Sequence, residues 1–370
     1  MKFSTSKTEL QKALQKLAKA VPNRSTLPVL GCVLIDALEN KTTLKTTDLE
    51  ITIQTEVPSS LEEKGSCALP LKTLFEITNE LPDTRLTIKV DEKNRAVLTT
   101  DLGEYDLMAR PSDEFPATPE QINPKTISIP GKVLKELIDA TSFAVSRDEL
   151  KPALTGVFLK ISTDRITAVS TDGHKLVQHT RIDHDVEEME KDVIIPKKFL
   201  SYLSSQLKDE KTDLILSENN LSVVVGSDVV ITRIIDETFP NYKSVIPENN
   251  DKKLKVDKKQ LLGAIRRVSI FSNKSTHQVA LSLSSAECKI TTEDPEKSSK
   301  AQEVIGAEYK GDQVVIGYNA EYLKEIVAHI KGEEVVIELS TPVSAALFNS
   351  STTEKKTENI MLLMPIRLND

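Results

Sequence analysis

The segment STDGH, Ser170–His174, holds the side chains best suited to chemistry. Asp172 and His174 together could ligate a metal ion or act as a general base. The same residues suit a turn at the end of a strand, because Gly173 allows a sharp bend. Two observations favour the turn: the related segment TTDLE, Thr46–Glu50, has no histidine, and no further His or Cys ligand stands nearby in the sequence. A metal-dependent hydrolase that uses Asp172 and His174 remains the alternative.

The usual motifs of enzymes do not occur elsewhere in the chain. There is no GxGxxG, GxxxxGK[ST], HExxH or GxSxG string, and the three cysteines, Cys32, Cys67 and Cys288, form no CxxC pair. We therefore expect no catalytic residue, no cofactor and no metal, and a binding protein in place of an enzyme. Isolated cysteines fit a reducing cytoplasm. No apolar run approaches the roughly 20 residues that span a bilayer, and the first residues lack the apolar stretch of a signal peptide.

The 370-residue chain contains three similar segments in tandem. Asp48 and Asp172 are 124 residues apart, and Asp172 and Glu293 are 121 apart. The dipeptides at 115–116, 239–240 and 364–365, which are FP, FP and MP, recur at 124 and 125 residues. Such a long period indicates tandem domains and not a solenoid. We predict three similar α+β domains, at residues 1–124, 125–252 and 253–370.

Each repeat is predicted to hold two helices among alternating strands. In the first helix, Leu10, Ala13, Leu14 and Leu17 recur at helical spacing and form one apolar stripe. The first helices are expected at 7–20, 132–143 and 258–271, with Asp257 as an N-cap, and the second helices at 71–81, 197–207 and 320–331. Strand-like runs such as VLIDAL, LTIKV, GVFLKI and VVIEL lie between them.

Positive charge gathers on the predicted helices, although the chain has 48 basic and 56 acidic residues and a net charge of −8. On the first helix, Lys12, Lys16 and Lys19 cluster opposite the leucine stripe. Lysines in this arrangement can contact phosphates without reading sequence. They can also be ordinary solubilising residues on the back of a helix.

The repeat, the charge and several short motifs resemble the bacterial DNA polymerase III β subunit family, the β sliding clamps. The resemblance covers essentially the whole chain. Its motifs are MKF at the start, Arg24–Leu30, Thr46–Glu50, Phe115-Pro116, Ser170–Leu176, Phe239–Tyr242, Ile316–Leu323 and Met364–Leu368.

The resemblance implies the DNA clamp fold, with two helices per domain packed on antiparallel sheets. It implies a head-to-tail homodimeric ring that encircles duplex DNA without reading its sequence and confers processivity on DNA replication. The implied partners are the DNA polymerase III α subunit, the clamp loader, and other polymerases and repair proteins with clamp-binding motifs. No catalysis and no membrane are implied.

The resemblance also implies site residues. Positions on or near the DNA side are Arg24, Lys72, Arg147, Lys197 and Lys198, to which the helix geometry adds Lys12, Lys16 and Lys19. The implied groove for partner peptides comprises Leu154, Thr171, Gly173, His174, Lys175, Leu176, Pro240, Val245, Asn319, Tyr322, Val343, Met364, Pro365, Ile366 and Arg367. Its apolar members suit Leu or Phe anchors, and Met364 can adapt to several partners.

The chain departs from well-known clamps at two places. Ser244 and Thr276 stand where those clamps have, respectively, a basic and an aromatic residue at the groove rim, so the motif preference of the groove stays open. Asn369 and Asp370 extend past the usual terminal Arg-Leu.

The resemblance implies that ring closure joins two edge strands, one at about Gly103–Arg110 and one at about Pro295–Ile305. Tyr105 and Leu107 would meet Ile270 and Phe271 at an apolar centre. Acidic residues of the first domain, Asp101, Glu104 and Asp106, would face Lys297 and Lys300. Two alternatives stay open: edge charges that only prevent aggregation, and a repeat-built adaptor that holds proteins together without DNA.

Overall fold

The computed structural model describes residues 1–22, 24–38, 41–182, 192–352 and 355–368. The predicted Asn369-Asp370 extension lies outside these residues. The described chain forms two compact units, one of residues 1–132 with 198–234, and one of residues 133–197 with 235–370. The middle repeat thus contributes to both units, and every strand pairing within them is antiparallel.

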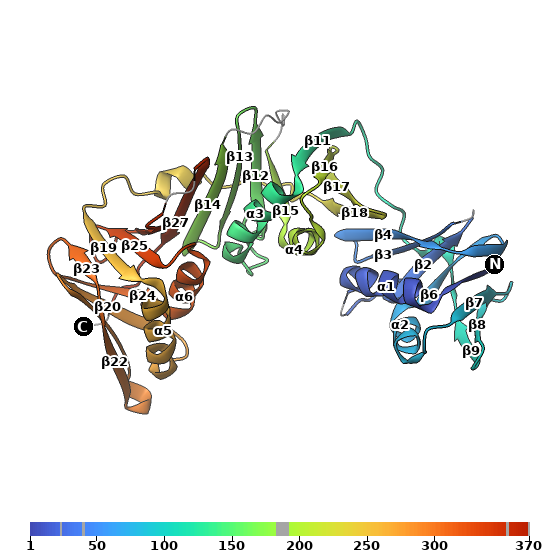
Figure 1. Cartoon of the computed structure of the whole chain (residues 1–370), viewed down its shortest axis with the longest axis horizontal. Helices are drawn as coiled ribbons and strands as arrows, with labels where there is room; N and C mark the ends of the chain where they lie inside the picture. The colour runs from blue at the N-terminus through green and yellow to red at the C-terminus, as the bar shows by residue number, and fades with distance from the viewer. Residues whose placement is uncertain (23, 39–40, 183–191, 353–354, 369–370) are drawn as a thin grey trace. The chain divides into compact units, whose positions relative to one another are not determined.

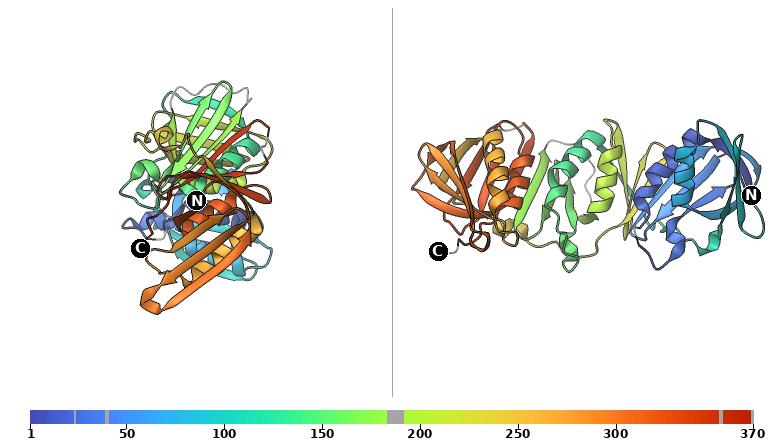
Figure 2. Two further views of the ribbon diagram at one scale, coloured as in Figure 1. Left: turned by 90° about the vertical axis from the view of Figure 1, so that its left-hand side faces the viewer. Right: turned by 90° about the horizontal axis from the view of Figure 1, so that it is seen from below.

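Unit 1 holds two sheets. The smaller sheet has the order β5 (Ser60–Glu63), β1 (Lys2–Ser6), β7 (Arg85–Val90), β8 (Arg95–Thr100) and β9 (Gly103–Met108). The larger has the order β10 (Arg110–Pro111), β6 (Gly65–Pro70), β2 (Cys32–Ala37), β3 (Lys41–Thr47), β4 (Ile51–Pro58), β18 (Asp228–Arg233), β17 (Asn220–Val225), β16 (Lys211–Leu216) and β11 (Lys125–Pro130). Helix α1 (Lys7–Leu17) packs against β4 and α2 (Leu71–Glu80), as Figures 1 and 2 show.

Unit 2 also holds two sheets. The larger has the order β15 (Val193–Pro196), β12 (Gly156–Ser162), β13 (Arg165–Thr171), β14 (Lys175–Ile182), β27 (Thr357–Leu363), β26 (Ala346–Ser350), β25 (Glu334–Leu339), β19 (Lys252–Asp257) and β23 (Glu308–Lys310). The smaller has the order β22 (Ser299–Gly306), β21 (Glu287–Asp294), β20 (Gln278–Ser284) and β24 (Val314–Asn319). Helices α5 (Lys258–Val268) and α6 (Ala320–His329) lie side by side (Figure 1). Helix α3 (Gly131–Thr141) belongs almost wholly to unit 2, and α4 (Lys197–Gln206) almost wholly to unit 1.

The six predicted helices are confirmed, with one consistent difference. The first helix of each repeat is α-helical for 11 residues and ends in a three-residue 3-10 turn, at 18–20, 142–144 and 269–271. The apolar stripe of α1 is buried as expected. Asp257 is the N-cap of α5, since its Oδ1 accepts a hydrogen bond from the Gln260 amide at 2.8 Å.

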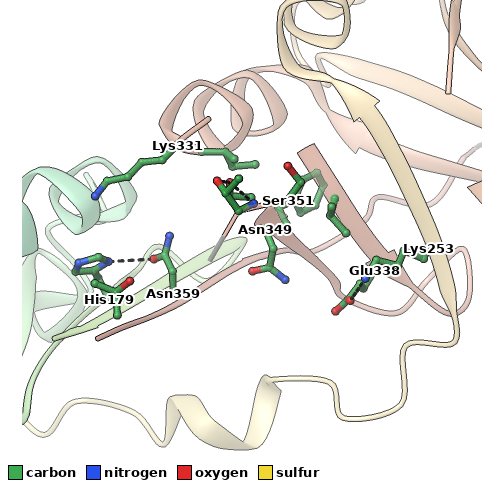
Figure 3. A pocket seen from close by; sticks show the side chains of 13 residues that line it. His179, Lys253, Lys331, Glu338, Asn349, Ser351 and Asn359 are labelled. Carbon is green, nitrogen blue, oxygen red and sulfur yellow. Dashed lines mark hydrogen bonds and ion pairs between the residues drawn. The ribbon is translucent and has the colours of Figure 1, made fainter. Parts of the chain in front are cut away.

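The wide sheet of unit 2 opens between β26 and β27. These strands pair only at Ala346–Phe348, whereas β27 stays paired with β14 as far as Thr357. A cavity of about 340 Å³ lies at the opening (Figure 3). Its lining is mostly polar and includes His179 of β14 and Asn359 of β27.

His179 is buried beside this cavity. Its Nδ1 lies 3.3 Å from Asn359 Oδ1, and its Nε2 has no hydrogen-bond partner among the described residues. Glu136 Oε1 lies 3.6 Å from Nε2, and Glu136 is itself held by Lys331 and Arg181. Burial is the main cause that lowers the pKa of His179, and the nearby cations add to it against the attraction of Glu136.

A histidine whose pKa is lower in the folded state than in the unfolded state binds its proton more weakly when the protein is folded. Protonation of this histidine therefore lowers the free energy of unfolding. We therefore expect the stability of the protein to be fully present above about pH 6.5, the ordinary histidine value, and to fall as the pH drops below it. Each unit of depression corresponds to about 1.4 kcal/mol. Thermal unfolding of the native protein and of His179→Gln between about pH 8 and pH 5.5 checks this, and the variant should lose less stability. Parallel pH profiles would show that His179 does not carry the effect.

Candidate functional site

The STDGH segment contains the end of β13 and the tight turn at 172–174 that leads into β14. Asp172 Oδ1 accepts hydrogen bonds from the amides of His174 and Lys175, each at 2.9 Å, and Asp172 Oδ2 lies 2.7 Å from Lys175 Nζ. Gly173 has a φ of +91°, which favours glycine. The Asp172 carboxylate is therefore engaged by its own turn, and the described residues hold no cluster of three or more His, Cys, Asp or Glu side chains that could bind a metal ion.

The first repeat has the same turn, 124 residues earlier. Asp48 Oδ1 accepts hydrogen bonds from the amides of Glu50 at 3.0 Å and Ile51 at 2.8 Å. Leu49 occupies the place of Gly173 with a φ of +78°. The sequence similarity of TTDLE and STDGH therefore reflects one shared turn.

Lys175 is buried at the base of the 172–175 turn. Its ammonium group lies 2.7 Å from Asp172 and 2.9 Å from Glu325 of α6, and 4.4 Å from the centre of the Tyr322 ring. Burial alone would lower the pKa of Lys175, but the hydrogen bonds that its ammonium group donates to the two carboxylates raise it. His174 stacks on Tyr322, with ring centres 5.4 Å apart. The ion pair between Lys175 and Glu325 therefore fixes the 172–175 turn to α6.

The carboxyl-terminal segment joins the same region. The Met364 amide donates to the His174 carbonyl at 2.8 Å, and the Ile366 amide donates to the Gly317 carbonyl at 2.9 Å. The segment from Met364 to Ile366 thus bridges the turn before β14 and strand β24. Four predicted groove residues, His174, Tyr322, Met364 and Ile366, are brought together in this way.

An apolar cluster of buried residues lies beside this turn. Leu176 is buried with Val169, Ala345 and Leu362, and the rings of Phe158, Phe239 and Tyr242 pack against the cluster. The Phe158 and Phe239 ring centres lie 5.0 Å apart. Val245, Val343 and Met364 are 52%, 61% and 39% exposed, so each offers apolar atoms to a ligand.

Sequence reasoning missed part of this apolar cluster. The missed residues are Phe158, Val169, Phe239, Tyr242, Ala345, Leu347 and Leu362. The motif FPNY held a signal for two of them, because Phe239 and Tyr242 stand on either side of the predicted Pro240. Phe158, Val169, Leu347 and Leu362 are ordinary strand residues, Ala345 directly precedes β26, and only the sheet brings them together.

Other predicted groove residues occupy varied positions. Thr171 is buried, and its hydroxyl donates to the Lys175 carbonyl at 2.7 Å. Asn319 caps α6, since its Oδ1 accepts from the Glu321 and Tyr322 amides, and its Nδ2 donates to the Thr276 carbonyl. Leu154 and Pro365 are partly buried, whereas Pro240, Arg367, Ser244 and Thr276 are exposed. The Asn319 side chain therefore acts as the N-cap of α6.

The predicted DNA-side lysines of α1 and of the 3-10 turn that follows it differ in their partners. Lys12 lies 3.1 Å from Glu9 and is 64% exposed. Lys16 lies 2.8 Å from the buried carboxylate of Asp228. Lys19 donates to the Ser205 hydroxyl at 3.3 Å and lies 5.2 Å from the centre of the Tyr202 ring. Only Lys16 is bound to a buried charge.

The remaining predicted cations follow the same division. Arg24 and Arg147 are exposed, and Lys72 is 88% exposed with Glu76 3.9 Å away. Lys198, in contrast, is paired with Asp48. Burial lowers the pKa of Lys197, and the positive charge of Arg147 lowers it further.

The two predicted joining strands are both sheet edges. β9 ends the five-stranded sheet of unit 1, and β22 ends the four-stranded sheet of unit 2. Both strands are shorter than predicted: β9 ends at Met108, and β22 begins at Ser299 because Pro295–Lys297 form a 3-10 turn. Tyr105 and Leu107 are half-buried.

The charges and apolar side chains near these edges are accessible. Ile270 and Phe271, at the end of the first helix of the third repeat, are 66% and 45% exposed. The Phe271 carbonyl accepts a hydrogen bond from the Ser299 hydroxyl of β22 at 3.2 Å. The predicted acidic residues Asp101, Glu104 and Asp106 and the predicted basic residues Lys297 and Lys300 are all exposed.

The cysteines are buried thiols with little nucleophilic character. All three cysteines are buried, and burial raises the pKa of Cys67 and of Cys288 to about 12, so both thiols stay protonated. Among the described residues, no helix combines the length and the apolar character needed to cross a membrane.

Three tandem α+β repeats with antiparallel sheets define the clamp fold, as predicted. The chain belongs to the DNA polymerase III beta subunit family: models of its N-terminal, central and C-terminal domains match residues 1–119, 128–241 and 243–366. It is a DNA sliding clamp of replication and is not itself catalytic, which confirms the function predicted from the sequence.

Known clamps are similar over their whole length. The beta sliding clamp of Pseudomonas putida is 30% identical over 375 residues, and that of Chlamydia muridarum is 27% identical over 372, with all of each chain covered. The sliding clamp of Bartonella birtlesii bound to griselimycin has a TM-score of 0.93 at 30% identity, and the DNA polymerase III subunit beta of Pseudomonas aeruginosa has 0.92 at 30%, each with both chains fully covered.

Proposed function

We propose that two copies of this chain close head to tail into a ring around duplex DNA and hold a replicative polymerase on it. The observation that carries this proposal is that β9 and β22 are both edge strands, each with one side not paired in its own sheet. β9 belongs to the first repeat and carries exposed acids, and β22 belongs to the third and carries an exposed lysine. Two different edges on one chain make a heterologous contact, which closes into a ring when the rotation allows it.

Contact with DNA is assigned to six of the eight cations predicted from the sequence. Exposed Lys12, Lys19, Arg24, Lys72 and Arg147, together with the partly buried Lys197, can each approach a phosphate. Such contacts release counterions, ignore sequence and let a protein slide. The paired lysines, Lys16 and Lys198, are considered separately below.

Partner proteins are assigned to the groove at the 172–175 turn. The cluster around Leu176 and the exposed Val245, Val343 and Met364 suit a short peptide with Leu or Phe anchors. Similar clamps from Bartonella birtlesii and Pseudomonas aeruginosa bind griselimycin. The partners proposed are the DNA polymerase III α subunit, the clamp loader, other polymerases and repair proteins.

The domain limits proposed for this architecture are 1–124, 125–252 and 253–370. A replication factor of this kind works where the bacterial chromosome is, so we propose that the protein acts in the cytoplasm. No cofactor and no metal are needed, because a closed ring acts by topology.

The ring proposal is tested on nicked circular DNA. Loaded with a clamp loader, the protein should stay on the circle through gel filtration and be lost after the circle is cut. A linear product lets a ring slide off its ends, whereas a protein that merely binds DNA remains. Equal retention on circular and linear DNA would contradict the ring, and no retention on either would favour an adaptor.

The groove is tested by placing a charge among its exposed apolar groups. Met364→Glu should weaken binding of a labelled peptide with Leu and Phe anchors at least about tenfold, or about 1.4 kcal/mol, because burying a carboxylate against that peptide is unfavourable. Val224→Glu, an equally exposed position in unit 1, is the matched control. Equal peptide affinity of the two variants, measured by fluorescence anisotropy, would place the peptide elsewhere.

Ring closure is tested by charge reversal. Lys297→Glu with Lys300→Glu should raise the dimer dissociation constant several-fold at low salt, and little at high salt, since each exposed pair is worth about 0–1 kcal/mol. The contribution is small also because Lys300 and Asp106 already have partners in their own chain, Glu293 and Arg95.

Sedimentation velocity measures the dimer, and Glu104→Lys with Asp106→Lys in the partner copy should restore it. Lys310→Glu, on a different strand edge, serves as the control. Unchanged dimerisation in the doubly reversed protein would reject the pairing and leave prevention of aggregation as the role of these charges.

A further inference from the structure

Two of the predicted DNA-side lysines are bound to carboxylates of another repeat. Lys16 of α1 places its ammonium group 2.8 and 3.1 Å from the two oxygens of Asp228. The Asp228 side chain is only 3% exposed, and Thr55 of β4 donates to its Oδ1 at 2.6 Å. The carboxylate is therefore fully engaged, with Lys16 as its counter-charge.

The second lysine makes the reciprocal contact. Lys198, at the start of α4 in the middle repeat, is paired with Asp48 of the first repeat. Asp48 is largely buried, and its other oxygen holds the 48–51 turn. Each repeat thus supplies one lysine and one buried carboxylate to the other.

The two ion pairs stand at opposite ends of one strand pairing. β4 and β18 are neighbouring strands (Figure 1). They run antiparallel, from Gln54 opposite Val229 to Ile51 opposite Thr232. Asp228 adjoins the first of these ends. At the other end the Arg233 amide donates to the Glu50 carbonyl, next to the Asp48 turn. These four residue pairs of β4 and β18, called the β4–β18 ladder, join the sheet of the first repeat to that of the second within unit 1. An ion pair of a lysine with a buried carboxylate lies at each end of the ladder.

We propose that Lys16 and Lys198 are positioning residues that lock the first repeat to the middle repeat, and that they contribute little to DNA affinity. This inference rests on the proposed DNA contact of the neighbouring cations. A phosphate could recruit either lysine only by leaving a buried carboxylate without its counter-charge, which is strongly unfavourable. A lysine already neutralised by the protein also releases few counterions from DNA.

The middle repeat shows the alternative arrangement at the equivalent turn. There Asp172 takes its cation from Lys175, three residues along the same turn. In the first repeat this position is Ile51, which carries no charge. Lys198 from α4 supplies the missing cation, so the first turn is held by the neighbouring repeat while the second keeps its lysine at the groove.

The test separates locking from DNA contact by measuring both in the full chain. Lys16→Gln and Lys198→Gln are compared with Lys12→Gln and Lys72→Gln, which remove exposed lysines. Each variant is examined by thermal unfolding, by hydrogen exchange of the β4 and β18 amides, and by the salt dependence of binding to a labelled duplex.

We expect Lys16→Gln and Lys198→Gln to lower the melting temperature by about 3 °C or more and to speed exchange of the ladder amides about tenfold, with the salt slope nearly unchanged. The control variants should keep the melting temperature. The slope of log K against log salt concentration should become shallower by about 0.9 for each phosphate contact removed. Lys16→Gln combined with Asp228→Asn should recover part of the melting temperature, because no unpaired charge is then buried.

The proposal is overturned if Lys16→Gln and Lys198→Gln reduce the salt slope as the controls do and leave unfolding and exchange unchanged. Failure of the proposed DNA contact has a different signature. In that case the control variants show no change in slope, while the melting and exchange results still report whether the two lysines lock the ladder.

Discussion

The architecture depends on backbone pairing that crosses from one repeat to the next. β4 pairs with β18, and β14 pairs with β27, so each large sheet combines strands of two repeats. Because a sheet edge exposes unpaired amides and carbonyls, joining the edges of neighbouring repeats satisfies those groups and shields them from unwanted association. This is also why the compact units do not coincide with the repeats: the middle repeat is shared between two continuous sheets.

Local features of this fold could be read from the sequence, because they depend on neighbouring residues. The stripe of Leu10, Leu14 and Leu17 predicts α1, and Asp257 predicts the start of α5, since spacing and capping act within a few residues. The 3-10 ends of the first helices and the late start of β22 were not predicted. Both depend on how the chain leaves an element, where backbone choices differ little in energy.

The site was predictable to the extent that it belongs to motifs. STDGH, FPNY and the final MPIRL include His174, Pro240, Met364 and other groove positions. Phe158, Ala345 and Leu362 carry no motif. They meet only because β12 and β27 share a sheet with β26, which Ala345 directly precedes. Lys16 likewise resembles its neighbours Lys12 and Lys19 in sequence, and its buried partner stands 212 residues away. Contacts at such separation follow from tertiary structure alone.

The same kind of side chain therefore has two physical roles in this protein. An exposed lysine keeps its full hydration and its freedom to follow a moving phosphate, which suits weak contact with sliding DNA. A lysine beside a buried carboxylate loses hydration and freedom of movement. Its positive charge compensates a negative charge that would otherwise be too costly to bury. Lys175 shows the second role at the 172–175 turn, between Asp172 and Glu325, where it fixes the turn on which His174 and Met364 meet. Counting basic residues on helices thus overestimates the charge available to DNA, and burial of the opposing carboxylate separates the two roles.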